Sequence, residues 1–194
     1  MNVFIETIRS IFVSNPYDIT TSKSEYLYVH DDKGAKQTFM SEINLLPNIS
    51  IQLSNPNKYE IVHICIDGGL IEYGLFDYVG DGLPHGRNDC MVFSGKELLL
   101  IELKMDVEED SLDKTRWAKY SDAMRQITDF YLYLKNQLEK KEKPITIFYS
   151  QTAIHPIVCM KNPPKSSAQR NNEKEKFRIK TKLKIETGIK YDFI

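Results

Sequence analysis

The chain has 194 residues, with 26 lysines and arginines against 27 aspartates and glutamates, and a formal net charge of −1. This length suits a single domain, residues 1–194, that buries a core. The near balance of charges excludes a protein that holds nucleic acid through its overall charge, so any affinity for phosphates must come from local patches.

Three cysteines, Cys65, Cys90 and Cys159, lie in apolar runs and lack metal-ligand spacing. This pattern favours buried thiols in a reducing compartment. No run of the sequence approaches the roughly 18 apolar residues of a membrane span. We therefore expect a cytoplasmic protein with no membrane partner.

The N-terminal part of the chain predicts a short amphipathic helix over residues 3–13 and a strand at 26–29. His30 stands next to two aspartates and is expected in a solvated turn after this strand. Residues 37–46 are expected to form a second helix that ends before Pro47.

Residues 49–79 have the pattern of a sheet. Apolar and polar residues alternate over 49–53, and the β-rich run 60–66 is followed by 70–79 as its returning partner. His63 lies in the middle of a predicted strand, and we expect a hydrogen-bonded core histidine rather than a metal ligand.

The next segment predicts a tight hairpin, with apolar runs at 89–93 and 98–101 joined by Ser94-Gly95-Lys96-Glu97. Glycine at the first central position is typical of a type II′ turn, which requires a positive φ there. Counting outward from the turn, Asp89 faces Glu102, and Lys104 shares their face because side chains alternate along a strand. The other positions are apolar on both faces, as in the centre of a covered sheet.

Two facing carboxylates repel each other unless a positive charge lies between them. A divalent cation satisfies both Asp89 and Glu102, and oxygen ligands favour Mg²⁺, with Mn²⁺ as a substitute. Lys104 is placed to orient or activate a water, or to neutralise developing charge on a phosphate. The alternative is a cross-strand salt bridge at a wet strand end.

Asp89 followed by Glu102-Leu103-Lys104 after an apolar strand resembles the core motif of the PD-(D/E)xK nuclease superfamily, which includes restriction endonucleases and Holliday-junction resolvases. The resemblance covers about residues 85–150 and implies an α/β, restriction-endonuclease-like core with a mixed central β-sheet flanked by helices. It implies that Asp89, Glu102 and the main-chain carbonyl of Leu103 bind Mg²⁺ or Mn²⁺, and that Lys104 assists the attacking water. Asn88 stands where the family's proline precedes the aspartate.

The family often carries a further glutamate on a helix ahead of the hairpin. Glu42 fits that place and Glu6 is its rival. An ordinary surface carboxylate remains the alternative for both, so the extra acid is Glu42, Glu6 or absent.

A long amphipathic helix follows the acidic stretch after the hairpin. Its apolar residues recur at steps of three and four, which predicts one buried face over about six turns. That face comprises Trp117, Tyr120, Met124, Ile127, Tyr131, Leu134 and Leu138. The resemblance implies a catalytic glutamine on this helix, and Gln126 falls in the matching place.

Two apolar runs come next. Residues 145–149 predict a buried strand, and 153–160 extend it or pair with it. Hairpin, long helix and strand is the order that the resemblance implies for the nuclease core.

The C-terminal segment 161–194 begins with a strongly basic stretch over 161–184. We expect residues 163–167 to be mobile and the tail to fold back as strand. This segment is the best phosphate-contact candidate, although a solvated basic surface is the alternative. The candidate nucleic-acid contacts are Arg87, Arg116, Lys165, Arg170 and Lys174.

The sequence therefore leads to the hypothesis of a Mg²⁺-dependent nuclease acting on DNA. The alternatives are a catalytically silent nucleic-acid-binding or interaction protein with this fold, and a non-nuclease metal-binding domain. The resemblance also raises a homodimer, since many such endonucleases pair to cut two strands. Phage defence, restriction and repair are among the biological settings that it leaves open.

Overall fold

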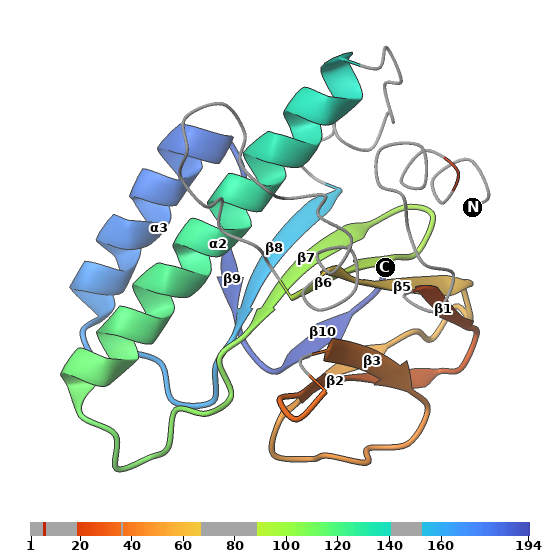
Figure 1. The fold of residues 1–194 in the computed structure, drawn as a ribbon, viewed down its shortest axis with the longest axis horizontal. Coiled ribbons are helices and arrows are strands. Elements are labelled where there is room, and N and C mark those ends of the chain that lie inside the picture. The colour runs from red at the N-terminus through yellow and green to blue at the C-terminus, as the bar shows by residue number, and fades with distance from the viewer. Residues whose placement is uncertain (1–5, 7–18, 36, 67–88, 141–152) are drawn as a thin grey trace.

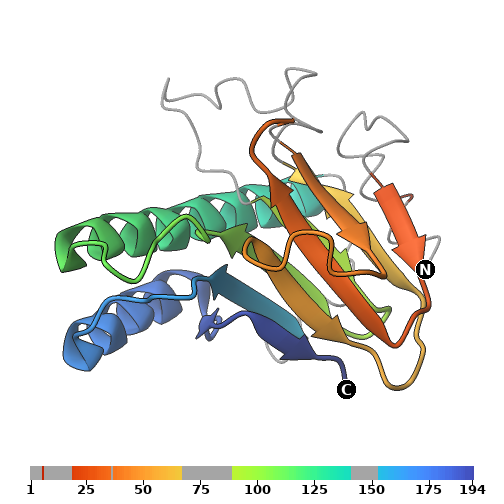
Figure 2. The same cartoon turned by 90° about the horizontal axis from the view of Figure 1, so that it is seen from below.

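The computed structural model describes residues 6, 19–35, 37–66, 89–140 and 153–194. The described chain forms three layers, in which a pair of helices covers one face of a six-stranded sheet and a four-stranded sheet covers the other (Figures 1 and 2). The predicted α/β class, with a mixed sheet flanked by helices, is confirmed at this level.

The larger sheet contains the candidate site and has the strand order β1-β5-β6-β7-β8-β9. Its strands are β1 (Ile19–Ser22), β5 (Ile61–Cys65), β6 (Cys90–Phe93), β7 (Leu98–Leu103), β8 (Ile154–Cys159) and β9 (Glu186–Thr187). In this sheet β1, β5, β6 and β7 each run antiparallel to the next strand, whereas β7, β8 and β9 run parallel to one another. The sheet is therefore mixed, and the C-terminal ends of the three parallel strands lie side by side at one end of the sheet.

The smaller sheet has the order β10-β4-β2-β3. Its strands are β2 (Tyr26–Asp32), β3 (Gln37–Ser41), β4 (Ser50–Ser54) and β10 (Lys190–Asp192). Leu27, Ile51 and Leu53 from this sheet pack with Val92 and Leu99 from the larger one in a single buried cluster. The hairpin of β6 and β7 is consequently shielded from water on this face.

Two helices cover the opposite face of the larger sheet. Helix α2 (Asp113–Lys140) connects β7 to the parallel strand β8, and α3 (Ser167–Thr181) lies beside it (Figure 1). Tyr120, Ile127 and Leu134 of α2 are fully buried against the sheet, which confirms the predicted apolar face. Among the described helices, none is both long and apolar enough to cross a membrane.

The predicted hairpin is confirmed in its turn and in its register. Phe93 pairs with Leu98, Cys90 pairs with Ile101, and Gly95 has a φ of +87°. The predicted strands 49–53 and 60–66 correspond to β4 and β5. His63 is 1% exposed and lies within hydrogen-bonding distance of the Thr20 and Thr38 hydroxyls, and burial lowers its pKa to about 3.

The predicted helix at 37–46 and the solvated position of His30 are both wrong. Strand β2 continues past Val29 to Asp32, and the chain turns back as β3, which pairs with β2 along its length. His30 is therefore a strand residue with no exposed surface, and its ring stacks on Phe39. The pairing partner, which local spacing does not reveal, decided the structure of this segment.

The prediction of strand for the basic tail is wrong for most of its length. Residues 167–181 form α3, whose N-cap is Ser166, and the tail contributes only the short strands β9 and β10. Phe177 and Ile179 are two residues apart, so they would share one face of a strand. Phe177 is 3% exposed whereas Ile179 is 59% exposed, so they lie on different faces. The buried face follows a helical period instead.

Several predictions lie outside the described residues. They are the helix at 3–13, the strands at 70–79 and 145–149, and the candidate phosphate contact Arg87.

The turn that sets the hairpin register can be tested with Gly95→Ala. No heavy atom lies within 4 Å of the Cβ that the substitution adds, so its cost comes from the positive φ alone. We expect the free energy of unfolding to fall by about 1–2 kcal/mol in chemical denaturation. Gly188→Ala is the control, because Gly188 lacks a left-handed φ and its added Cβ meets no atom closer than 3.9 Å. Equal losses in both variants would contradict the assigned turn.

Candidate functional site

Two carboxylates meet at the open end of the β6–β7 hairpin. Asp89 directly precedes β6, and Glu102 is the penultimate residue of β7. The Asp89 main-chain N–H donates to Glu102 Oε2 at 3.1 Å, and the Leu103 N–H donates to Asp89 Oδ2. These crossed hydrogen bonds hold both side chains at one end of the strand pair, as the predicted register requires.

Lys104 connects this strand end to helix α2. Its main-chain N–H donates to the Cys159 carbonyl at 2.8 Å, which anchors the residue beside β8. Its ammonium Nζ lies 2.7 Å from Glu102 Oε1 and donates to Gln126 Oε1 at 2.9 Å. The structure thus brings together Asp89, Glu102, Lys104 and Gln126, all of which were predicted as site residues.

Asp122 also belongs to the site and was not predicted from the sequence. Its Oδ2 lies 3.4 Å from Lys104 Nζ, and its Oδ1 accepts a hydrogen bond from Arg125 at 2.7 Å. Asp122 precedes Gln126 by four residues, so both lie on the same face of α2. That spacing was the available signal, since a predicted role for Gln126 directs attention to the side chain one turn earlier.

Burial and charge together favour a cation at this site. The Glu102 side chain is 1% exposed, and burial, followed by the negative charge of Asp89, raises its pKa well above the ordinary value although Lys104 acts in the opposite direction. Burial alone would lower the pKa of Lys104, but the carboxylates of Glu102, Asp89 and Asp122 raise it overall. Lys104 is therefore an ammonium at neutral pH, and three carboxylates surround it.

The carboxylate oxygens suit a cation that retains water in its coordination shell. Glu102 Oε1 is buried and accepts no geometrically aligned hydrogen bond within the described chain, although Lys104 Nζ is close. The described residues contain no cluster of three or more His, Cys, Asp or Glu side chains placed to hold a metal. Mg²⁺ commonly binds one or two carboxylates and keeps several waters, whereas structural zinc needs a closed set of four ligands. Asp89 and Glu102 therefore fit Mg²⁺ or Mn²⁺.

Leu103 contributes to the site through its main chain only. Its side chain is 4% exposed and packs in the cluster between the two sheets, away from the helix-facing carboxylates. Any metal contact from this residue would come from its carbonyl oxygen, as the resemblance implies.

The two candidates for an extra acid lie differently. Glu42 follows β3 rather than lying on a helix, and it accepts a hydrogen bond from Ser22 Oγ at 2.6 Å. Ser22 pairs with Ile61, at the opposite end of β5 from the residue that pairs with Cys90. Glu42 is therefore separated from Asp89 by the length of a strand, and Glu6 is an exposed residue.

The predicted phosphate contacts divide into two groups. Arg116 is 6% exposed, and its guanidinium donates to the main-chain carbonyls of Ser111, at 3.1 Å, and Glu109. Arg116 therefore stabilises the loop before α2, in contrast to the phosphate contact expected of it. Lys165 is exposed ahead of α3, while Arg170 and Lys174 lie on α3 and line a pocket.

Comparisons of the chain with protein-family models, with curated proteins and with solved structures find no match.

The electrostatic account of Glu102 can be tested by its effect on stability. A carboxyl whose pKa is higher in the folded state disfavours folding once the pH exceeds its ordinary pKa. We expect Glu102→Gln to unfold at the same or a higher temperature than the wild type at pH 8, with the difference shrinking as the pH falls from the raised pKa of Glu102 toward the ordinary pKa of a glutamate, below which both states are neutral. Lys104 keeps Asp122 and Gln126 as partners in this variant.

Glu97→Gln is the matched control. Glu97 is also buried, but it accepts hydrogen bonds from the Tyr191 hydroxyl at 2.9 Å and the Ile194 N–H at 3.0 Å. Loss of its charge should weaken those bonds and lower the free energy of unfolding by about 1–2 kcal/mol. Comparable destabilisation in both variants would show that the Glu102 charge is as well satisfied as that of Glu97.

Proposed function

We propose that the protein is a Mg²⁺-dependent nuclease that hydrolyses phosphodiester bonds, with DNA as its substrate. The observation that carries this proposal is the convergence of Asp89 and Glu102 beside an ammonium, Lys104, at one buried strand end. The pKa of Glu102 is raised by burial and by the neighbouring charge of Asp89, so its ionisation is costly for folding alone, and a divalent cation bound by both carboxylates would offset that cost.

The topology supports the same proposal. Strands β5, β6 and β7 form an antiparallel unit, and α2 then crosses to the parallel strand β8. This is the order of elements that the resemblance to the PD-(D/E)xK nucleases implies. We therefore propose a restriction-endonuclease-like core around β5, β6, β7, α2 and β8.

The ionisation of Lys104 limits its part in the reaction. A divalent metal bound by Asp89 and Glu102 would polarise the phosphate and lower the pKa of a bound water. Lys104, as an ammonium, donates hydrogen bonds that orient the attacking water and stabilise charge on the phosphoryl oxygens. Gln126 and Asp122 hold its Nζ from α2 and are positioning residues.

A catalytically silent nucleic-acid-binding protein is the second candidate. The contacts of Lys104 with Glu102, Asp122 and Gln126 favour it, because an ammonium with three partners also occurs in purely structural networks. This candidate requires nucleic-acid binding without cleavage under any metal condition.

Cleavage is tested with plasmid, linear and single-stranded DNA and with RNA, each with Mg²⁺, Mn²⁺ or EDTA. We expect metal-dependent cleavage of DNA that EDTA abolishes. Lys104→Ala should reduce single-turnover cleavage by about 10²–10⁴-fold, while DNA affinity falls only modestly, because the ammonium acts mainly in the transition state.

Lys119→Ala is the control. It removes the same charge from an exposed position on α2, where Lys119 pairs with Asp106 at 3.0 Å. This variant should cleave like the wild type. Equal losses of binding and cleavage in Lys104→Ala would reduce Lys104 to an anchor, and binding without cleavage by the wild type would favour the silent protein.

A further inference from the structure

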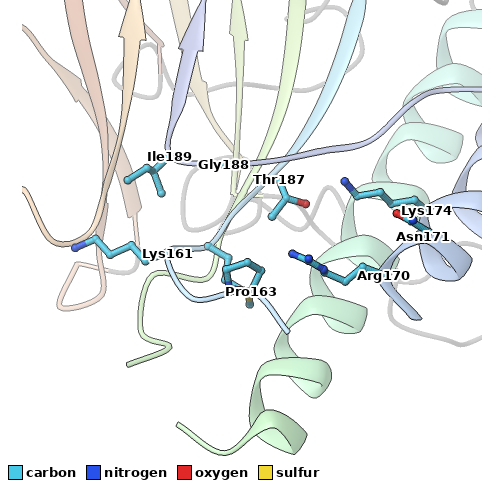
Figure 3. A pocket seen from close by; sticks show the side chains of 9 residues that line it. Lys161, Pro163, Arg170, Asn171, Lys174, Thr187, Gly188 and Ile189 are labelled. Atoms are coloured by element: carbon cyan, nitrogen blue, oxygen red, sulfur yellow. The ribbon is translucent and has the colours of Figure 1, made fainter. Parts of the chain in front are cut away.

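A pocket of about 440 Å³ lies between the first turns of α3 and the C-terminal ends of β8 and β9 (Figure 3). Arg170, Asn171 and Lys174 line it from α3, and Thr187 lines it from β9. No carboxylate is among the described residues that line the pocket. Its polar lining is therefore made of groups that donate hydrogen bonds or carry positive charge.

Arg170 and Lys174 are four residues apart and share one face of α3, so two like charges lie side by side. Burial and the nearby charge of Arg170 lower the pKa of Lys174, against the opposite effect of Glu186. Within the described chain neither residue forms a salt bridge. Two neighbouring cations in a concave site favour an anion between them.

Other cations of the same helix are arranged differently. Lys176 Nζ lies 2.6 Å from Glu173 Oε1, and Arg178 is held by both oxygens of Glu175. Lys176 and Arg178 are therefore each paired with a carboxylate on the same helix, whereas Arg170 and Lys174 form no such ion pair within the described residues. The contrast makes the pocket a specific feature rather than one part of a uniformly basic helix.

The side chains converge inside the pocket. Arg170 and Lys174 extend from α3 toward Thr187 (Figure 3), whose hydroxyl lies 3.4 Å from the Tyr120 hydroxyl. Lys161 lines the rim, but its ammonium donates to Asn48 at 3.1 Å and extends away from the other two cations (Figure 3). A guanidinium fork, an ammonium and a hydroxyl suit the oxygens of a tetrahedral phosphate group.

The pocket lies at the same end of the larger sheet as Lys104, where the parallel strands finish. Strands β7, β8 and β9 are parallel and in register, with Leu103 opposite Cys159 and Val158 opposite Thr187. Two strand spacings, about 10 Å, therefore separate the ends of β7 and β9. One nucleic-acid strand can span that distance with two of its phosphates.

We infer that the pocket formed by Arg170, Lys174 and Thr187 binds a backbone phosphate of the substrate strand near the one that is cleaved. The identification of the ligand as a nucleic-acid strand rests on the proposed function. The suitability of the pocket for a phosphate group rests only on its own residues. The contact fixes the path of the strand across the ends of β7, β8 and β9.

The test compares two double variants of the full chain. Arg170→Gln with Lys174→Gln removes the two pocket cations contributed by α3, and Lys176→Gln with Arg178→Gln removes one lysine and one arginine that are paired with carboxylates on the same helix. We expect the pocket variant to lose about one phosphate contact, which is a change of about 0.7–0.9 in the slope of log K against log salt. The control variant should keep the wild-type slope, and equal changes in the two variants would overturn the inference.

A competition experiment separates a strand phosphate from a small phosphate ligand. Inorganic phosphate should weaken binding of a single-stranded oligonucleotide to the wild type more than to the pocket variant at equal ionic strength. Binding of inorganic phosphate at Arg170 and Lys174 can be monitored by NMR. If phosphate binds there without displacing the oligonucleotide, the assignment of the pocket to a strand phosphate is wrong.

The outcomes separate this inference from the proposed function. A wild type that binds oligonucleotides through the pocket but never cleaves them would refute the nuclease proposal and support the pocket. A wild type that cleaves, with a pocket variant that binds and cleaves as well, would overturn the pocket and leave the nuclease proposal standing.

Discussion

The charge of Glu102 is the constraint on which the site depends. Its strand lies at the centre of a sheet covered by helices on one face and by a second sheet on the other, so water cannot solvate the carboxylate. The chain nevertheless places Asp89 beside it, which raises the cost of ionisation. Lys104 offsets part of that cost, and a divalent cation would offset more.

The two ends of the same hairpin each bury a carboxylate, and the two carboxylates differ in how fully the fold satisfies them. At the turn, Glu97 receives hydrogen bonds from Tyr191 and the Ile194 N–H, which attach the C-terminal residues to the sheet. At the open end, Glu102 receives one main-chain hydrogen bond and the ammonium of Lys104, and its Oε1 lacks an aligned donor. Glu97 is thus satisfied by the fold, and Glu102 remains suited to bind a further cation.

Local rules predicted the parts of the fold that depend on turn length and on the spacing of apolar residues along the chain. A glycine in a two-residue turn predicted the register that brings Asp89 beside Glu102, and helical spacing identified α2. The choice of Gln126 on that helix came from the family resemblance and not from the spacing. The same rules failed where distant partners decide the structure, as at 37–41, which pairs with β2. Asp122 was missed although it lies one turn before Gln126, because its role depends on how α2 lies over Lys104, and helical spacing alone does not determine that tertiary contact.

The most direct test is the position of a metal in a crystal of the protein grown or soaked with Mn²⁺. We predict an anomalous scattering peak between the carboxylates of Asp89 and Glu102, with the Lys104 ammonium displaced from Glu102 Oε1 and still in contact with Gln126. If crystals at a saturating concentration of Mn²⁺ show no peak beside Glu102 and keep its 2.7 Å contact with Lys104, then Asp89 and Glu102 are not a metal site.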